Sequence, residues 1–222
     1  MRIRRKKNFN LRFTQVKDYV IVPERDLLNV KDAIKDKKPL DFNKIFNNNN
    51  PVCLEIGCGK GGFIIKLAKK YPNYNFIAVE MLDNIILMAS ENAKNENLKN
   101  VVFFNSGAEY LERYILENSI DKIFLNFSPP YPQKSYENRR LTNDILVQFY
   151  KKALKNNGSI YQKTDDVAFF EYSKEKFIEN GFSVIDYSGI TDTKEFLCET
   201  TEYEEKFRKL GVKINGLIAV KE

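Results

Sequence analysis

The chain of 222 residues contains no histidine and no tryptophan, and it has only three cysteines. The absence of histidine excludes catalysis by a serine or cysteine that histidine activates, and it removes the commonest zinc ligand. The cysteines, Cys53, Cys58 and Cys198, are scattered, and their spacing predicts neither a zinc site nor a disulfide framework. Any catalysis must therefore use carboxylates, amides, hydroxyls, lysines and the positioning of substrates.

Long apolar runs are also missing, since no stretch approaches the roughly 20 residues that a membrane-spanning helix requires. The basic N-terminus is not followed by the apolar segment of a secretory signal. Hydrophobic residues make up 43% and charged residues 30% of the chain, which is ordinary for a soluble globular protein. We therefore expect a cytoplasmic protein with one sizeable domain, without a membrane or a metal as partner.

Residues 52–63 carry the most informative pattern. A short apolar strand, 52–56, contains the acid Glu55, and a helical pattern begins at Phe63. Between them the backbone is rich in glycine, which permits a tight turn and the close approach of a ligand. The glycines are Gly57, Gly59, Gly61 and Gly62. Strand, glycine turn and helix in this order are typical of a nucleotide-type site in an open α/β sheet.

A second acid, Glu80, follows the next expected strand, 76–79. A carboxylate at that strand end can accept hydrogen bonds from both hydroxyls of a ribose. Glu55 would repel a pyrophosphate but suits a cation, so the pair of acids favours S-adenosylmethionine, which carries a sulfonium and an ammonium, over NAD. The alternative is an ordinary α/β turn that binds no ligand.

Strands and helices alternate from residue 51 onward, whereas residues 1–50 form a basic N-terminal arm and an irregular lead-in. The alternation predicts an α/β fold with a mostly parallel sheet and helices on both faces. The last two strands, 182–187 and 213–220, lack the usual crossover helix between them, so we expect one of them to run antiparallel. The other expected strands are 101–104, 123–126 and 159–162, and the other expected helices are 84–93, 108–116, 142–154 and 167–179.

Two local signals fix the ends of the helix expected at 142–154. Thr142 is predicted to cap its N-terminus, and Gly158 is predicted to lie just beyond its C-terminus.

The net charge of +6 comes from clustered basic residues. One cluster is the arm of Arg2, Arg4, Arg5, Lys6 and Lys7, and another is Lys134, Arg139 and Arg140, close to Tyr131 and Tyr136. Each cluster alone fits a solvated tail or loop. Together with a nucleotide-type site, they are also suited to a phosphate backbone.

The stretch that follows the expected strand 123–126 is stiff and aromatic. It reads Asn126-Phe127-Ser128-Pro129-Pro130-Tyr131-Pro132, and its prolines restrict φ. Asn126 presents an amide at the strand end, and Tyr131 offers a ring on which a base could stack. The stretch resembles the Asn-x-x-Pro-Pro-Tyr motif of amino-group methyltransferases, but its core differs.

The whole chain resembles the bacterial tRNA (guanine-N7-)-methyltransferases, which modify the guanosine at position 46 in the variable loop of tRNA. The most specific matching segments are 54–61, 126–142, 163–166 and 201–207. The resemblance implies a Rossmann-like, S-adenosylmethionine-dependent methyltransferase fold over 51–222, with tRNA as the substrate. Three family residues are replaced, by Gly107, Pro129 and Tyr131, and Gln133 stands where lysine is frequent.

The resemblance also implies roles for individual residues. The residues implied to bind the cofactor are Glu55, Gly57, Gly59, Glu80, Gly107, Ala108 and Asn126. The residues implied to contact the substrate guanosine are Gln133, Asp165, Thr201, Glu202, Tyr203 and Glu204. The residues implied to contact the rest of the tRNA are Lys134, Arg139 and Arg140.

Other interpretations of the same residues remain open. Asp165 precedes a helix and fits an N-cap, while Thr201 and Glu204 have the spacing of a capping box. For the chain as a whole, one alternative is a catalytically impaired RNA-binding module on a methyltransferase fold. Another is an enzyme of this fold that acts on a small molecule or an exocyclic amine. The sequence is compatible with a monomer or a homodimer.

Overall fold

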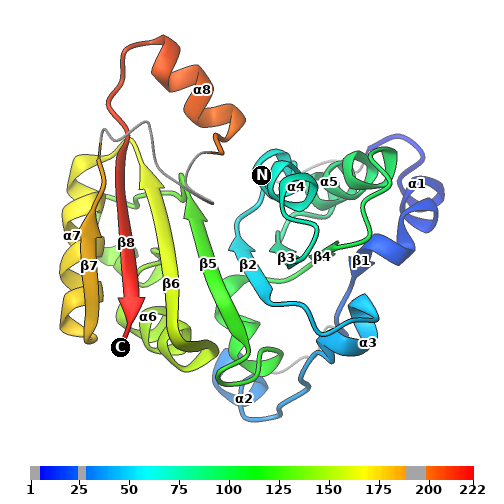
Figure 1. The fold of residues 1–222 in the computed structure, drawn as a ribbon, viewed down its shortest axis with the longest axis horizontal. Coiled ribbons are helices and arrows are strands. Elements are labelled where there is room, and N and C mark those ends of the chain that lie inside the picture. Colours follow the sequence, from blue (N-terminus) through cyan, green and yellow to red (C-terminus); the bar gives the residue numbers. More distant parts are fainter. Residues whose placement is uncertain (1–5, 25–28, 189–198) are drawn as a thin grey trace.

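The computed structural model describes residues 6–24, 29–188 and 199–222. Arg2, Arg4 and Arg5 of the basic arm, and Cys198, lie outside the described residues. In the described part, eight strands form one sheet in the order β1-β4-β3-β2-β5-β6-β8-β7, drawn in Figure 1. The strands are β1 (Val20–Ile21), β2 (Val52–Ile56), β3 (Asn75–Val79), β4 (Val101–Phe104), β5 (Ile120–Asn126), β6 (Leu154–Thr164), β7 (Phe182–Asp186) and β8 (Asn215–Lys221).

The sheet is parallel except at one strand. The neighbours from β1 to β6 pair in parallel, whereas β8 runs antiparallel to both β6 and β7. The predicted mostly parallel sheet with an antiparallel last strand is therefore confirmed. The strand order reverses between β2 and β5, which places the point where such sheets bind ligands beside the end of β2.

The helices cover both faces of the sheet, as predicted. The α-helices are α1 (Phe9–Gln15), α2 (Val30–Ala33), α3 (Phe42–Phe46), α4 (Gly62–Lys70), α5 (Asp83–Asn95), α6 (Asp144–Ala153), α7 (Val167–Glu179) and α8 (Glu202–Lys209). Short 3-10 turns occupy Lys17–Tyr19 (η1), Ala108–Arg113 (η2) and Lys134–Arg139 (η3).

Side-chain alternation along the central strands explains the two covered faces. Val52 and Leu54 of β2 join one core cluster with residues of α6 and α7, whereas Cys53 between them joins a second cluster with residues of α4 and α5. All five residues of β2 are buried. A parallel strand buried on both faces needs a continuous apolar run, and Glu55 is the one charged residue in it.

The N-terminal region is more regular than predicted. The sequence predicts an irregular lead-in over 1–50, but this region contains α1, α2, α3 and β1. Val20 and Ile21 of β1 pair in parallel with Phe103 and Phe104 of β4 and extend the sheet at its edge. The sequence pattern misses β1 because two residues show no periodicity. The domain boundary near residue 50 stays a prediction.

Both end signals predicted for α6 are wrong. The N-cap is Asn143, whose side chain accepts a hydrogen bond from the Leu146 amide, while Thr142 is buried and bonds Ser173. Gly158 lies inside β6 rather than after the helix, because α6 ends at Ala153 and β6 begins at once.

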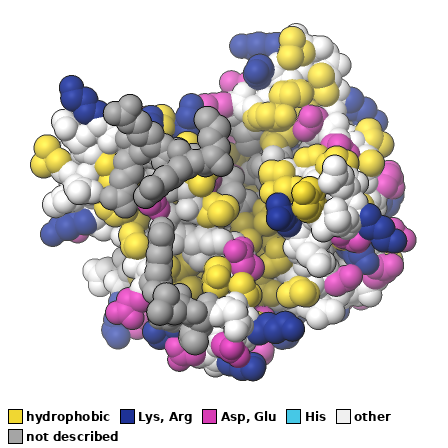
Figure 2. Space-filling view, turned by 180° about the vertical axis from the view of Figure 1, so that it is seen from behind, with side chains coloured by type: hydrophobic (Ala, Val, Ile, Leu, Met, Phe, Trp, Pro, Cys, Tyr) yellow, Lys and Arg dark blue, Asp and Glu magenta, His cyan; other side chains and the backbone are white. Residues whose placement is uncertain are grey.

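The surface mixes charges of both signs. On the face drawn in Figure 2, lysine and arginine side chains occur in separate groups among acidic and apolar ones rather than as one continuous patch. Among the described helices, none has the length and apolar character needed to cross a membrane.

Candidate active site

The ends of β2 and β5 meet where the strand order reverses, and a polar pair joins them. Asn126 Nδ2, at the end of β5, donates a hydrogen bond of 3.0 Å to Glu55 Oε1 in β2. The two strands pair in register, with Glu55 opposite Phe124, which brings these side chains together. The predicted site residues Glu55 and Asn126 therefore form one polar group at the carboxyl edge of the sheet.

Glu55 is buried with only half of its carboxylate satisfied. Glu55 is 2% exposed, and its Oε2 has no hydrogen-bond partner among the described residues. Burial raises the pKa of Glu55 to about 7, against the opposing effect of the Asn126 hydrogen bond. A buried oxygen without a partner is costly, so this arrangement is suited to a cationic ligand that would provide the missing contact.

The glycine turn leaves open space beside this carboxylate. Gly57 and Gly59 have φ angles of +80° and +55°, which L side chains rarely adopt, and a Cβ on either would meet no atom within 4 Å. The amides of Gly57 and Cys58 donate to the Val79 carbonyl, so the turn is fixed against the end of β3. The turn is therefore held in place and leaves room for a ligand.

A cavity of about 450 Å³ lies between the glycine turn, the end of β5 and α8. This volume falls within the range of small-molecule sites. The cavity is lined by Glu55, Gly57, Cys58, Gly59, Lys60, Gly62, Phe63, Asn126, Phe127, Thr201, Glu202, Tyr203 and Lys206.

Glu80 lies next to the turn. Its Oε1 accepts a hydrogen bond of 2.9 Å from the Leu82 amide, and burial raises its pKa while backbone donors, including Gly59, oppose that shift. Farther along the same sheet edge, Gly107 precedes Ala108 at the start of η2. A Cβ on Gly107 would collide with the carboxylate of Glu109, which therefore fills the space beside this turn.

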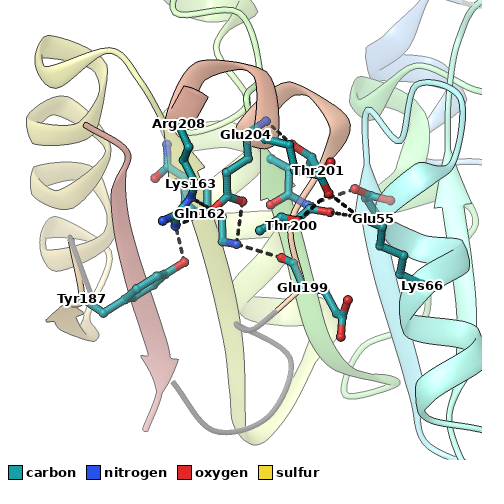
Figure 3. A network of polar contacts seen from close by, with 12 residues as sticks. Glu55, Lys66, Gln162, Lys163, Tyr187, Glu199, Thr200, Thr201, Glu204 and Arg208 are labelled. Carbon is teal, nitrogen blue, oxygen red and sulfur yellow. Dashed lines mark hydrogen bonds and ion pairs between the residues drawn. The ribbon is translucent and has the colours of Figure 1, made fainter. Parts of the chain in front are cut away.

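Glu204, which is buried in the first turn of α8, anchors that helix through ion pairs with two cations (Figure 3). Glu204 is 0% exposed. Lys163 Nζ, from β6, contacts its Oε2 at 2.9 Å, and Arg208 contacts its Oε1 at 2.7 Å. Lys163 Nζ also donates to the Glu199 carbonyl at 2.9 Å. Both carboxylate oxygens of Glu204 are thus used inside the protein.

A second set of contacts ties α8 to α4. Lys66 Nζ contacts Glu205 at 2.8 Å and the Thr200 carbonyl at 3.0 Å, and Lys70 contacts Glu199 at 2.9 Å. Thr201 caps α8 by accepting a hydrogen bond from the Glu204 amide. These contacts hold the first turn of α8 over the cavity.

The loop after β5 is strained and internally held. Phe127 and Tyr131 have positive φ angles of 51° and 42°, which cost energy in residues other than glycine. Arg140 donates hydrogen bonds to the carbonyls of Pro130 and Tyr131, and its guanidinium lies 4.2 Å from the centre of the Tyr172 ring. Arg140 therefore stabilises the loop conformation.

Its neighbours Lys134 and Arg139 are exposed. The Arg139 guanidinium lies 4.5 Å from the Tyr136 ring centre, and neither cation is ion-paired within the described part of the chain. Gln133 is also exposed and precedes η3. Lys134 and Arg139 are free to contact a polyanion, in contrast to Arg140.

Asp165 and Asp166 also differ in whether the protein itself uses their side chains. Asp166 caps α7, since its Oδ1 accepts a hydrogen bond of 2.7 Å from the Phe169 amide. Asp165 has no hydrogen bond or ion pair to any residue that the structure describes. Burial, followed by the charge of Asp165, raises the pKa of Tyr203, which places this carboxylate near the aromatic side of the cavity.

Comparisons with known proteins agree with this geometry. A family described as "Putative methyltransferase" matches residues 49–217. A tRNA (guanine-N(7)-)-methyltransferase of Oceanobacillus iheyensis is 40% identical over 181 residues, covering 80% of this chain and 83% of the relative. One of the same name from Alkaliphilus oremlandii is 37% identical over 208 residues, covering 88% of this chain and 97% of the relative.

The chain belongs to the tRNA (guanine-N(7)-)-methyltransferase family. Solved structures support the fold alone. The 16S rRNA methyltransferase KamB is 12% identical with a TM-score of 0.62, covering 84% of this chain and 95% of that one. A 30S ribosomal A1408 methyltransferase from an uncultured bacterium is 20% identical with a TM-score of 0.59, covering 83% and 96%.

Within this family fold, the predicted site residues fall into two groups. The cavity lining includes Glu55, Gly57, Gly59, Asn126, Thr201, Glu202 and Tyr203. Outside the lining are Glu80, Gly107, Ala108, Gln133, Lys134, Arg139, Arg140, Asp165 and Glu204. The sequence reasoning missed Lys60, Phe127 and Lys206. The position of Lys60 within the glycine run is a signal that could have identified it, whereas Lys206 is recognisable only once α8 is placed.

Proposed function

We propose that this chain transfers a methyl group from S-adenosylmethionine to N7 of the guanosine at position 46 in the variable loop of tRNA. The observation that carries the proposal is the unpartnered, buried Oε2 of Glu55 beside the open glycine turn. A carboxylate in that setting suits the ammonium of an amino-acid cofactor. The names of the relatives support tRNA as the substrate and guanine N7 as the acceptor.

The residues present fit this cofactor, which when bound supplies a methyl group on a positively charged sulfur. Glu55 would bind its ammonium, and Glu80 would accept hydrogen bonds from the ribose hydroxyls. Gly57 and Gly59 let the backbone approach without a Cβ in the way. Gly107 and Ala108 would flank the adenine, with the carboxylate of Glu109 next to them.

The chemistry requires little from acid–base groups. Guanine N7 exposes a lone pair at neutral pH, and its methylation yields a cationic base without the loss of a proton. The absence of histidine is therefore no obstacle. The protein would act by holding N7 in line with the methyl group, an effect that supplies roughly 7–11 kcal/mol. Nearby carboxylates would stabilise the positive charge that develops on the base.

Asp165 is the better candidate for reading the guanine edge. Guanine N1–H and N2–H are adjacent donors that one carboxylate can accept. Glu204 is unsuited because Lys163 and Arg208 already occupy its oxygens. Asp165 is partly exposed, near Tyr203, and has no partner in the described ranges. We therefore assign the guanine edge to Asp165 and a positioning role to Glu204.

We also propose tRNA contacts for the other residues that the sequence predicts to bind the substrate. Thr201, Glu202 and Tyr203 would surround the target nucleotide from α8, and Gln133, Lys134 and Arg139 would contact the tRNA beyond it. The protein would act in the cytoplasm as a monomer or a homodimer.

The test uses tRNA transcripts that differ only in the base at position 46. Guanosine at position 46 is compared with 7-deazaguanosine, which lacks N7, and with adenosine. We expect transfer of radioactive methyl from S-adenosylmethionine to the first transcript only. Methylation of the 7-deaza transcript would place the product elsewhere, and tRNA binding without any transfer would favour a non-catalytic RNA-binding module.

A further inference from the structure

Two lysines lie on the rim of the cavity and come from different elements. Lys60 is part of the glycine turn between β2 and α4, and Lys206 is on α8. Both are exposed, and both line the cavity of about 450 Å³ that also contains Glu55. The entrance to the buried carboxylate is thus flanked by two positive charges.

Neither lysine is neutralised by a described carboxylate, and this differs from the lysines nearby. Every lysine of α4 has a carboxylate partner at 2.8–2.9 Å. These pairs are Lys66–Glu205, Lys69–Glu96 and Lys70–Glu199. Glu199 and Glu205, near the first turn of α8, are therefore already paired with α4, whereas Glu202 lies over Gly62 at the start of that helix.

The size of the cavity limits what these lysines can contact. A volume of about 450 Å³ admits a small cofactor or a single base but not a folded RNA. A base that reaches such a site must leave its stack, and its own backbone then stays at the entrance. The phosphates on either side of that nucleotide would lie where the two lysines are, and lysine is a common phosphate ligand.

We propose that Lys60 and Lys206 bind the backbone phosphates that flank the target guanosine and so hold the nucleotide in the cavity. The inference rests on the proposed function but concerns residues that neither the sequence reasoning nor the relatives' names assign. The two lysines act mainly on tRNA affinity, because both are exposed where they line the cavity, whereas Glu55 is buried.

The experiment measures tRNA binding by the full chain as a function of salt, together with the KM for tRNA. Lys60→Gln and Lys206→Gln should each reduce the slope of log affinity against log salt by roughly 0.7–0.9, the value for one lost phosphate contact. Each should raise the KM for tRNA on the order of threefold to tenfold. Calorimetric affinity for S-adenosylmethionine should change less than tRNA affinity, since both lysines are exposed whereas Glu55, the carboxylate assigned to the cofactor, is buried.

Two matched controls remove the same charge elsewhere. Lys209 is exposed on α8 but outside the lining of this cavity, and Lys99 is exposed before β4 at the opposite edge of the sheet. Lys209→Gln and Lys99→Gln should leave the salt slope and KM unchanged. The proposal is overturned if Lys60→Gln and Lys206→Gln behave like these controls. A wild-type chain that methylates no tRNA would contradict the proposed function, while the binding slopes would still decide the role of the lysines.

Discussion

Glu55 and Glu204 are both fully buried carboxylates at the same edge of the molecule, yet their surroundings differ. Glu204 joins α8 to β6, and each of its oxygens contacts a cation. Glu55 lies in β2, just before the glycine turn. One of its oxygens accepts a hydrogen bond from Asn126, and the other has no partner in the described part of the chain. Burial raises the pKa of Glu55 to about 7, and the hydrogen bond from Asn126 opposes this shift only in part.

This difference separates two uses of a buried charge. A carboxylate whose oxygens are fully used by the protein positions an element, and one that keeps a free oxygen is available to a ligand. The same contrast recurs in neighbouring residues of the site. Asp166 caps α7 while Asp165 has no partner among the described residues, and Arg140 supports the loop while Arg139 is exposed.

The largest expected effect is on stability, at the network of Glu204. Glu204→Gln removes the buried carboxylate that contacts Lys163 and Arg208, which should lower the free energy of unfolding by roughly 3–5 kcal/mol. Glu205→Gln removes an adjacent but exposed pair with Lys66 and should cost less than about 1 kcal/mol. Urea unfolding of both variants measures the difference, and equal costs would refute the structural role of Glu204.

The next effect is the pH dependence that Glu55 gives to the unliganded protein. Its pKa is about 7 when folded against an ordinary 4.5, so the folded chain binds the proton more tightly between these values. Stability should therefore fall as pH rises from about 4.5 to 7, by about 3 kcal/mol, and level off above. Glu55→Gln should lose this dependence. Unfolding curves at several pH values test it, and identical profiles for the two proteins would contradict it.

A smaller effect should distinguish Asp165 from Asp166. Asp165→Asn should lower kcat/KM for tRNA by roughly 30-fold, because a charged hydrogen-bond acceptor for the guanine edge is lost, while stability stays near wild type. Asp166→Ala should instead cost about 1 kcal/mol of stability through the lost cap of α7. Methylation kinetics and thermal unfolding of both variants provide the comparison. A near-normal rate for Asp165→Asn would remove it from the substrate site.

The smallest effect separates Arg139 from Arg140. Arg139→Gln should reduce the salt slope of tRNA binding by roughly 0.7–0.9 if it contacts one phosphate. Arg140→Gln should leave that slope unchanged but lower kcat by about tenfold, because the Pro130–Tyr131 turn loses its hydrogen bonds. Arg140→Lys should not restore activity, since one ammonium cannot replace the guanidinium fork. A reduced salt slope for Arg140→Gln would instead indicate that Arg140 contacts a tRNA phosphate.

The sequence predicted the parts of the molecule that depend on short-range patterns. The glycines directly follow the apolar strand that contains Glu55, and Glu80 follows the next apolar strand, so the fold could be inferred from them. The cofactor roles of these residues stay predictions. The antiparallel last strand was predicted because no usual crossover helix was recognised between the last two strands, although α8 does lie between them in the chain. These features need no knowledge of which distant residues meet.

The parts that were missed depend on tertiary contacts. Thr201 and Glu204 have capping-box spacing, and Thr201 does cap α8, but the Glu204 side chain turns to Lys163, far away in sequence. From the sequence alone, Arg140 is one member of a basic cluster. The structure shows that it donates hydrogen bonds to the carbonyls of Pro130 and Tyr131. A partner that lies on another element leaves no periodic signal in the sequence.

The most direct test of the account is the calorimetric affinity for S-adenosylmethionine of wild type, Glu55→Gln and Glu204→Gln, each at pH 6 and pH 8. If the ionised carboxylate of Glu55 binds the cofactor, wild type should bind roughly tenfold more weakly at pH 6 than at pH 8. Glu55→Gln should bind weakly at both pH values, while folded Glu204→Gln should retain the affinity and pH profile of wild type. Full affinity in Glu55→Gln, or a loss confined to Glu204→Gln, would contradict the assignment of the two buried acids.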